Sequence, residues 1–200
     1  MNLARVVLAV VVACSLASAL ATSASARSFE VSSQTFRASF RELRFRGVFG
    51  TTNCVVTLEG SLHTRIIAKS AGALIGYITR ATLGACSALT ATMLSATLPW
   101  HIRYAGFSGA LPNIERLRTD VVGFSVALHE TGGITCLLRS AASEPVRPEY
   151  EISAGTITGV AITGSIRTGA ECFGAALTFT SDRAPVTVLN STTRITLRLI

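Results

Sequence analysis

The chain has 200 residues, of which 49% are hydrophobic and 14% are charged, and its formal net charge is +7. This length allows one domain with a real core, and no segment after the first 26 residues is apolar for long enough to cross a bilayer as a helix. The excess of basic residues predicts a surface that attracts anionic polymers or lipid head groups at low ionic strength.

The first 26 residues have the pattern of an export signal. Met1–Arg5 is short and basic, Val6–Leu20 is apolar, and Ala24-Ser25-Ala26 is a cleavage site of small residues. Polar residues interrupt the apolar run, which makes it too short for a transmembrane anchor. We expect residues 1–26 to be a signal peptide and residues 27–200 to form a single secreted β domain.

A lipoprotein is the alternative interpretation of this segment. Val11-Val12-Ala13-Cys14 resembles a loose bacterial lipobox, in which the cysteine is acylated and becomes the new N-terminus. The apolar run continues beyond Cys14 instead of ending there, which weighs against acylation. An acylated Cys14 would make the protein membrane-anchored rather than secreted.

Four cysteines remain after cleavage, an even number that is typical of disulfides in an oxidising compartment. None of them forms a C-x-x-C pair, so zinc or redox chemistry is not expected. Three pairings are possible, and we favour the one that closes the shortest loops. It joins Cys54 to Cys86 and Cys136 to Cys172.

Phe29 to Val48 alternates between apolar and basic residues with the period of a strand. The parity shifts by one near Arg41-Glu42, which predicts a β-bulge. The basic face contains Arg37, Arg41, Arg44 and Arg46. Two interpretations stay open: a basic strip for a polyanion, or an ordinary exposed face on which arginine stems cover apolar surface.

The next segments are also mainly β. Cys54 to Leu58 is predicted as a strand, followed by strands at Ala88 to Leu98 and Ile114 to His129. Between them, residues 70–83 carry a helical apolar stripe that Ser70 could cap, although Gly72 and Gly76 disfavour a helix and several residues favour a strand. A short helix is the expectation here.

The segment from Trp100 to Phe107 holds the only tryptophan and lies between the two cysteine pairs. Its alternation predicts a strand with one buried face in the middle of the core. If the protein is a barrel with a ligand inside, the residues nearest that ligand are predicted to be Trp100, His101, Tyr104 and Phe107.

The C-terminal third contains Ile134 to Arg139, a loop from Ser140 to Arg147, and three further β segments: Thr156 to Arg167, Cys172 to Thr180, and Val186 to Leu199. Short strands at this spacing predict an all-β, antiparallel fold, either a sandwich or a closed barrel, with the one short helix packed against it.

The sequence carries no convincing catalytic or metal motif. Gly123-Phe124-Ser125-Val126-Ala127 approximates a nucleophile elbow with His129 nearby, but it lacks the last glycine and reads through as a strand. The carboxylates show no pairing, and the histidines are too dispersed for a metal motif. No catalytic residue, metal or cofactor is predicted. Nucleic acid is not expected as a partner, because the aromatic residues near the arginines point to the opposite face.

Three segments together resemble uncharacterised secreted β-rich proteins of high-GC actinobacteria: Cys54 to His63, Ile75-Gly76-Tyr77 and Leu98-Pro99-Trp100-His101. The resemblance implies an export signal and a cysteine-bearing β domain, and it implies no activity or site residue.

The sequence therefore favours a non-enzymatic, exported cell-envelope or extracellular binding protein with a mildly basic surface. Its partner would be an anionic envelope polymer or lipid head groups. A β-barrel that binds a small apolar ligand is the alternative, and a secreted hydrolase comes third.

Overall fold

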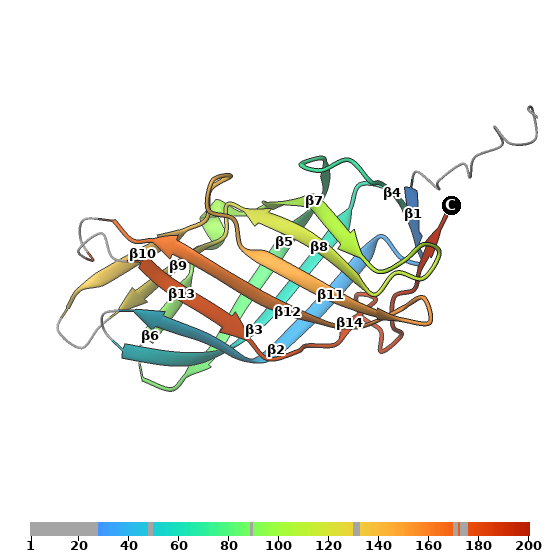
Figure 1. Ribbon diagram of the computed structural model, residues 1–200. Helices are drawn as coiled ribbons and strands as arrows, with labels where there is room; N and C mark the ends of the chain where they lie inside the picture. Colours follow the sequence, from blue (N-terminus) through green and yellow to red (C-terminus); the bar gives the residue numbers. More distant parts are fainter. Residues whose placement is uncertain (1–27, 48–49, 89, 130–132, 170–171, 173–175) are drawn as a thin grey trace, which may run out of the picture.

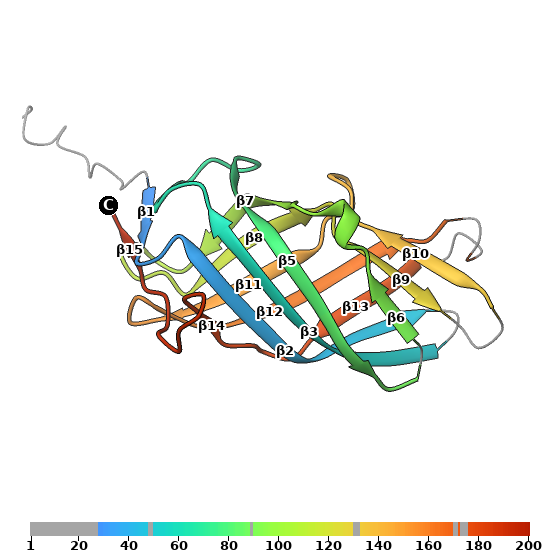
Figure 2. The same ribbon diagram turned by 180° about the vertical axis from the view of Figure 1, so that it is seen from behind.

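Long strands with one apolar face build a closed antiparallel barrel (Figures 1 and 2). The computed structural model describes residues 28–47, 50–88, 90–129, 133–169, 172 and 176–200. The predicted signal peptide and Cys14 lie outside these residues. Among the described residues, no helix is long and apolar enough to cross a membrane.

Eight strands form the barrel wall, in the spatial order β2-β3-β5-β7-β8-β11-β12-β13, and the pairing of β13 with β2 closes the ring. Their bounds are β2 Thr35–Gly47, β3 Gly50–Leu62, β5 Leu74–Cys86, β7 Trp100–Ser108, β8 Arg116–Val122, β11 Arg147–Ser153, β12 Thr156–Arg167 and β13 Ala176–Ser181. The prediction of an all-β fold is confirmed, and of its two forms the closed barrel is the correct one.

Two small sheets extend the barrel at its two ends. The first contains β1 (Ser28–Val31), β4 (Ile66–Ala68) and β15 (Leu197–Leu199), and the second contains β6 (Thr90–Met93), β9 (Ser125–His129) and β10 (Thr135–Arg139). The remaining elements are β14 (Val186–Thr187), which pairs with β2, and the 3-10 helix η1 (Ser95–Thr97).

The interior is filled because strand residues alternate between the two faces of the wall. Along β2, Phe36, Phe40 and Phe45 are buried while the arginines between them are exposed. Trp100 is fully buried at the start of β7 and lies edge-on to Phe124, with ring centroids 5.0 Å apart. The predicted apolar face of the first long strand and the central position of Trp100 are both confirmed.

The predicted β-bulge lies where β2 changes neighbours. The register with β3 shifts between Phe40 and Leu43, and at this point β2 stops pairing with β14 and begins to pair with β13. The carboxylate of Asp182, between β13 and β14, accepts hydrogen bonds from the backbone N–H groups of Arg41 and Glu42 at 3.3 and 3.2 Å. A side chain therefore satisfies the donors that the bulge removes from the ladder.

The sheet β10-β9-β6 repeats the order of β11-β8-β7, because each of its strands adjoins one of those three along the chain. Gly123, with φ of +93°, turns β8 into β9. The N–H of Gly123 donates to the carbonyl of buried Ser140, whose hydroxyl donates to the carbonyl of Val121. The predicted single strand from Ile114 to His129 is thus two segments joined by a bend.

The predicted short helix over residues 70–83 is wrong. Residues 74–86 form β5, which hydrogen-bonds to β3 on one side and β7 on the other. Gly76 has a packing reason in this strand, since a Cβ there would collide with the carbonyl oxygen of Ser61 on β3. Because Gly76 has no side chain, the backbones of β3 and β5 can approach each other here. The apolar pattern of the sequence does not reveal this requirement.

Three further segments differ from the prediction. Of the predicted β segment from Val186 to Leu199, only β14 and β15 are strands. In the segment from Ala88 to Leu98 only β6 is a strand, and η1 follows it. The strand β11 was missed, because its first residue, Arg147, was assigned to the predicted loop and Pro148 follows it. The proline stands before the three residues, Glu149 to Glu151, that pair with β8, so it removes no donor from that ladder.

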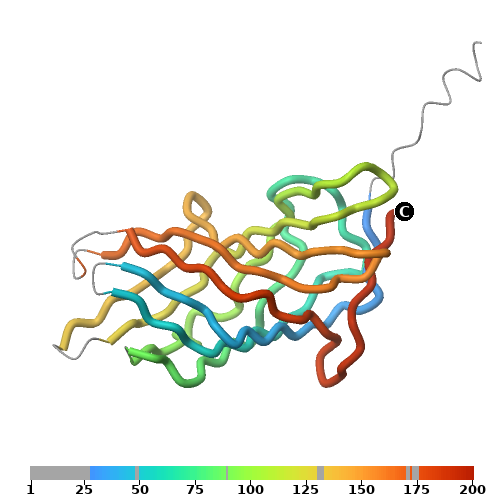
Figure 3. Tube along the Cα trace, turned by 60° about the horizontal axis from the view of Figure 1, so that its bottom comes forward, coloured from blue at the N-terminus to red at the C-terminus, as the bar shows by residue number. Residues whose placement is uncertain are grey.

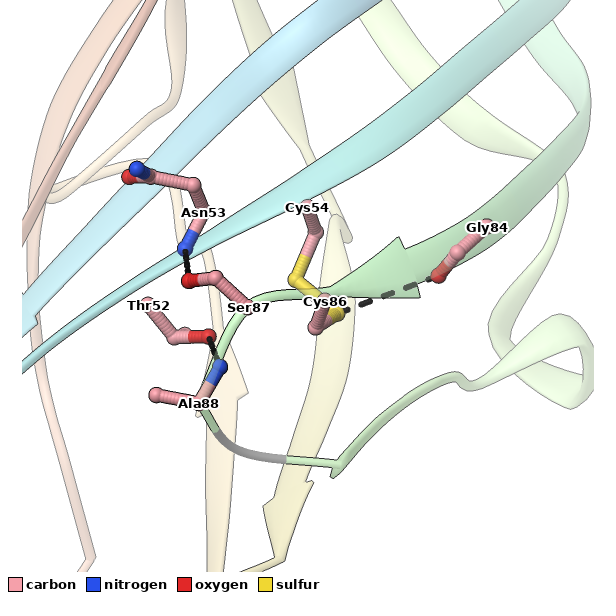
Figure 4. Close-up of a disulfide and its surroundings, with 7 residues drawn as sticks. All are labelled: Thr52, Asn53, Cys54, Gly84, Cys86, Ser87 and Ala88. Carbon is pink, nitrogen blue, oxygen red and sulfur yellow. Dashed lines mark hydrogen bonds between the residues drawn. A yellow bond between two sulfur atoms is a disulfide. The ribbon is translucent and has the colours of Figure 1, made fainter.

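Both predicted disulfides are present and lie in the same half of the barrel. Cys54–Cys86 joins directly opposed residues of β3 and β5, and Cys136–Cys172 joins β10 to the connection between β12 and β13. Beyond Cys86 the chain stays attached to β3 (Figure 4): the backbone N–H of Asn53 donates to the hydroxyl of Ser87, and that of Ala88 donates to the hydroxyl of Thr52.

Candidate functional site

The four residues predicted to lie near a ligand are all on β7, but they point in different directions. Trp100 and Tyr104 are buried in the interior, His101 is exposed on the outer wall, and Phe107 is partly buried at the end of the strand. The indole N–H of Trp100 donates to the hydroxyl of Thr97 at 2.9 Å. None of the four lines the cavity that the interior contains.

That cavity has a volume of about 40 Å³ and lies near the end of the barrel where β1 and β4 pack. Its lining is aliphatic except for Phe36, Thr119 and Tyr150. Sites for small molecules usually measure about 300–1,000 Å³. The described interior therefore gives no support to a barrel that contains a ligand.

Burial raises the pKa values of two tyrosines in this part of the barrel. Burial raises the pKa of Tyr150, which lines the cavity. Burial also raises the pKa of Tyr104, and the positive charge of Arg118 partly offsets that effect. Tyr104 belongs to the hydrophobic core and Tyr150 packs against it, so we assign both to the packing of the barrel.

The predicted basic strip lies on the outside of β2, as the alternation required. Arg37, Arg41, Arg44 and Arg46 are all exposed. Arg37 forms an ion pair with Glu59 at 3.2 Å, and Arg44 pairs with Glu42. Within the described part of the chain, Arg41 and Arg46 form no ion pair, so their charges remain available to a partner.

Across the barrel closure, the basic strip continues into a surface rich in hydroxyl groups. β13 pairs with β2 and β12 pairs with β13, and the register aligns their outward side chains in two rows. One row contains Arg46, Thr178 and Ser165, and the other contains Arg44, Thr180 and Thr163. All six side chains are exposed, and we call this surface the arginine–hydroxyl wall.

A second surface cluster was not predicted. His63, Tyr77 and His101 lie on neighbouring segments of the outer wall, with ring centroids 4.8 Å apart for His63 and Tyr77 and 5.3 Å apart for Tyr77 and His101. No local pattern could have revealed it, because the three residues meet only through the register of β3, β5 and β7.

The approximate nucleophile motif does not form a catalytic pair. Ser125 is fully buried on β9, and its hydroxyl has no hydrogen-bond partner among the described residues. His129 lies four residues further along the same strand, about 13 Å away at the usual rise. The imidazole hydrogen-bonds instead with the hydroxyls of Thr135 and Thr92, at 3.0 and 3.2 Å. In the described ranges, no three His, Cys, Asp or Glu side chains gather as a metal site would require.

The fold and these surfaces define a disulfide-linked, closed antiparallel β-barrel with a filled interior and a basic outer face. No family model, no curated protein and no solved structure matches the chain. The resemblance to secreted actinobacterial proteins therefore stays a prediction, and the function has to be argued from the surface itself.

Proposed function

We propose that the protein is an exported, non-enzymatic binding protein of the cell envelope or the extracellular space. Its arginine–hydroxyl wall would hold an anionic, hydroxyl-bearing polymer. The observation that carries the proposal is the register that sets Arg44 and Arg46 beside four exposed hydroxyls on β12 and β13. Two disulfides, which are typical of oxidising compartments, support the exported location.

The chemistry of the wall fits a glycopolymer with phosphate or carboxylate groups. Guanidinium groups bind such oxyanions through paired N–H donors, and hydroxyls can both donate to and accept from the hydroxyls of sugars. Arg41 borders the wall and has no ion pair among the described residues, which adds a further available cation. The wall thus offers positive charge and polar donors over an extended strand surface.

A lipid surface fits the wall less well, because a bilayer also rewards exposed apolar side chains. The exposed large hydrophobic residues of the described chain are Val55, Ile66, Leu74, Leu111 and Ile200, and none of them belongs to β2, β12 or β13. Between the two anionic partners expected from the sequence, the wall therefore favours the polymer over lipid head groups.

Binding to a purified poly(glycerol phosphate) teichoic acid, with dextran as the uncharged comparison, tests the proposal. We expect binding to the charged polymer alone, with an affinity that falls as salt shortens the range of the exposed charges. The double variant Arg41→Gln/Arg46→Gln should bind roughly five- to tenfold more weakly at low salt, because each exposed charge contributes about 0.5 kcal/mol or slightly more.

The matched control removes the same charge from the other side of the ring, as Arg103→Gln/Arg118→Gln. Arg103 is on β7 and Arg118 on β8, which lie opposite β13 and β2 in the strand order. This control should retain the affinity within about twofold. An equal loss in both double variants, or equal binding to dextran, would rule out a specific wall.

A further inference from the structure

The exposed apolar residues of the protein are concentrated at one end. Of the five exposed large hydrophobics in the described chain, four lie at the end of the barrel that carries β1, β4 and β15. These four form the terminal tip: Ile66, Leu74, Leu111 and Ile200, with 55, 41, 42 and 44% of their surfaces exposed. The fifth, Val55, lies on the outer wall in β3.

Backbone pairing and a surface cleft place Ile66, Leu111 and Ile200 next to the terminal sheet. Glu30 of β1 faces Ile66, and Ser28 and Ile200 exchange backbone hydrogen bonds on the other side of the same strand. Pro112, next to Leu111, lines a surface cleft with the residues of β15. In Figure 3 the loop between β7 and β8 lies beside the C-terminus and the first described residues.

Three cations lie at this end of the barrel, together with the carboxylates of Glu30 and Glu115. Arg65 and Arg198 are exposed, and both form ion pairs with the single carboxylate of Glu30. The ammonium group of Lys69 lies over the rings of Phe29 and Phe107, 5.6 and 5.5 Å from their centroids. The apolar tip is therefore set in a positively charged rim, a combination that is typical of surfaces on anionic membranes.

The chain itself also leads to this end. The segment that precedes Ser28 contains the apolar run Val6–Leu20, and Ser28 opens β1, which is central in the terminal sheet. During export, or permanently if Cys14 is acylated, an N-terminal segment held in a bilayer would bring the terminal tip to the lipid surface before any other part of the barrel.

We infer that the terminal tip contacts an anionic lipid bilayer. Its half-exposed aliphatic side chains enter the head-group region while Arg65, Lys69 and Arg198 meet lipid phosphates. The arginine–hydroxyl wall runs along the side of the barrel and stays free for a polymer. This inference does not rest on the proposed function, since it involves other residues and another partner.

The test measures how the wild type and its variants partition onto lipid vesicles. The protein is purified after export, and its N-terminal residue is identified. The vesicles contain either phosphatidylcholine alone or phosphatidylcholine mixed with phosphatidylglycerol. The lipid concentration is kept low enough that only part of the protein binds, so that a partition coefficient can be measured. The variant Ile66→Ser/Ile200→Ser should lose about tenfold in this coefficient on the mixed vesicles, because it removes two partly inserted aliphatic side chains. Its thermal unfolding should show a single cooperative transition only a few degrees lower, since both side chains are about half exposed.

The matched control is Val55→Ser, which removes an equally exposed aliphatic side chain outside the terminal tip. It should keep the wild-type coefficient within twofold, as should Arg41→Gln/Arg46→Gln. Equal partitioning of the tip variant and Val55→Ser would overturn the inference, and so would equal partitioning onto neutral and anionic vesicles. Failure of polymer binding with a tip-dependent partition would reject only the wall.

Discussion

The two halves of the barrel interior are packed in different ways. In the half that contains both disulfides, which we call the cross-linked half, Trp100, Phe124, Phe179 and Phe45 form a continuous series of rings with centroids 5.0, 5.8 and 6.4 Å apart. In the other, which we call the terminal half, the ring of Phe29 lies against those of Tyr104 and Phe107, and mainly aliphatic side chains line the small cavity.

This difference matches how each half is closed. The cross-linked half holds the places where β6, β9 and β10 are offset from the main strands. One disulfide ties β10 to the connection between β12 and β13, and the other links the neighbouring wall strands β3 and β5. The terminal half is closed by pairing between the two ends of the described chain, β1 and β15, without a disulfide there. We infer that the cross-linked half is the rigid part and that the terminal half opens first in local unfolding.

The largest expected effect comes from truncating one ring in each half. Phe179→Ala should lower the free energy of unfolding by about 4–5 kcal/mol, because it leaves a cavity enclosed by other rings. Phe29→Ala should cost about 3 kcal/mol, because its surroundings at the end of the barrel can collapse further. Urea unfolding of both variants measures the difference. A larger cost for Phe29→Ala would contradict the proposed contrast between the halves.

Removal of a disulfide is expected to act on one half only. The cysteines of the two pairs are 32 and 36 residues apart. Closing a loop of this size corresponds to about 4 kcal/mol of chain entropy, and the measured loss of stability is often smaller. Cys136→Ser/Cys172→Ser should therefore cost about 3–4 kcal/mol. Hydrogen exchange should accelerate at β9 and β10 and stay unchanged at β1 and β15. Uniform acceleration would indicate that the halves unfold as one unit.

Much of the barrel could be predicted because its information is local. The alternation of Phe36, Phe40 and Phe45 with arginines defined an inner and an outer face, and a change of parity located the bulge. The rule of shortest loops gave both disulfides. What the local pattern lacked was the neighbour of each strand: residues 74–86 fit a helical stripe and a strand, and only hydrogen bonds to both β3 and β7 decide between them.

The candidate sites depended on that missing information. The wall exists because Arg46 faces Thr178, a residue 132 positions away in the sequence, and no stretch of sequence contains both. The terminal tip likewise combines Ile66 with Ile200, which lie on either side of β1. The arginines of the outer face were predicted individually, but the surface they share with the hydroxyls of β12 and β13 was not.

The smallest expected effect concerns alkaline pH, and it arises in the terminal half. Burial raises the pKa of both Tyr150 and Tyr104 above the ordinary value of 10.0. Above about pH 10 the unfolded chain releases these phenolic protons while the folded chain retains them, so the free energy of unfolding should be constant below about pH 9 and fall as the pH rises through 10. Urea unfolding between about pH 8 and pH 11 measures this fall. Tyr150→Phe and Tyr104→Phe should each make it shallower, because at both phenols burial outweighs the opposing interaction, a hydrogen bond with Thr119 at Tyr150 and the charge of Arg118 at Tyr104. An unchanged slope in Tyr150→Phe would show that this phenol already ionises with the folded barrel intact.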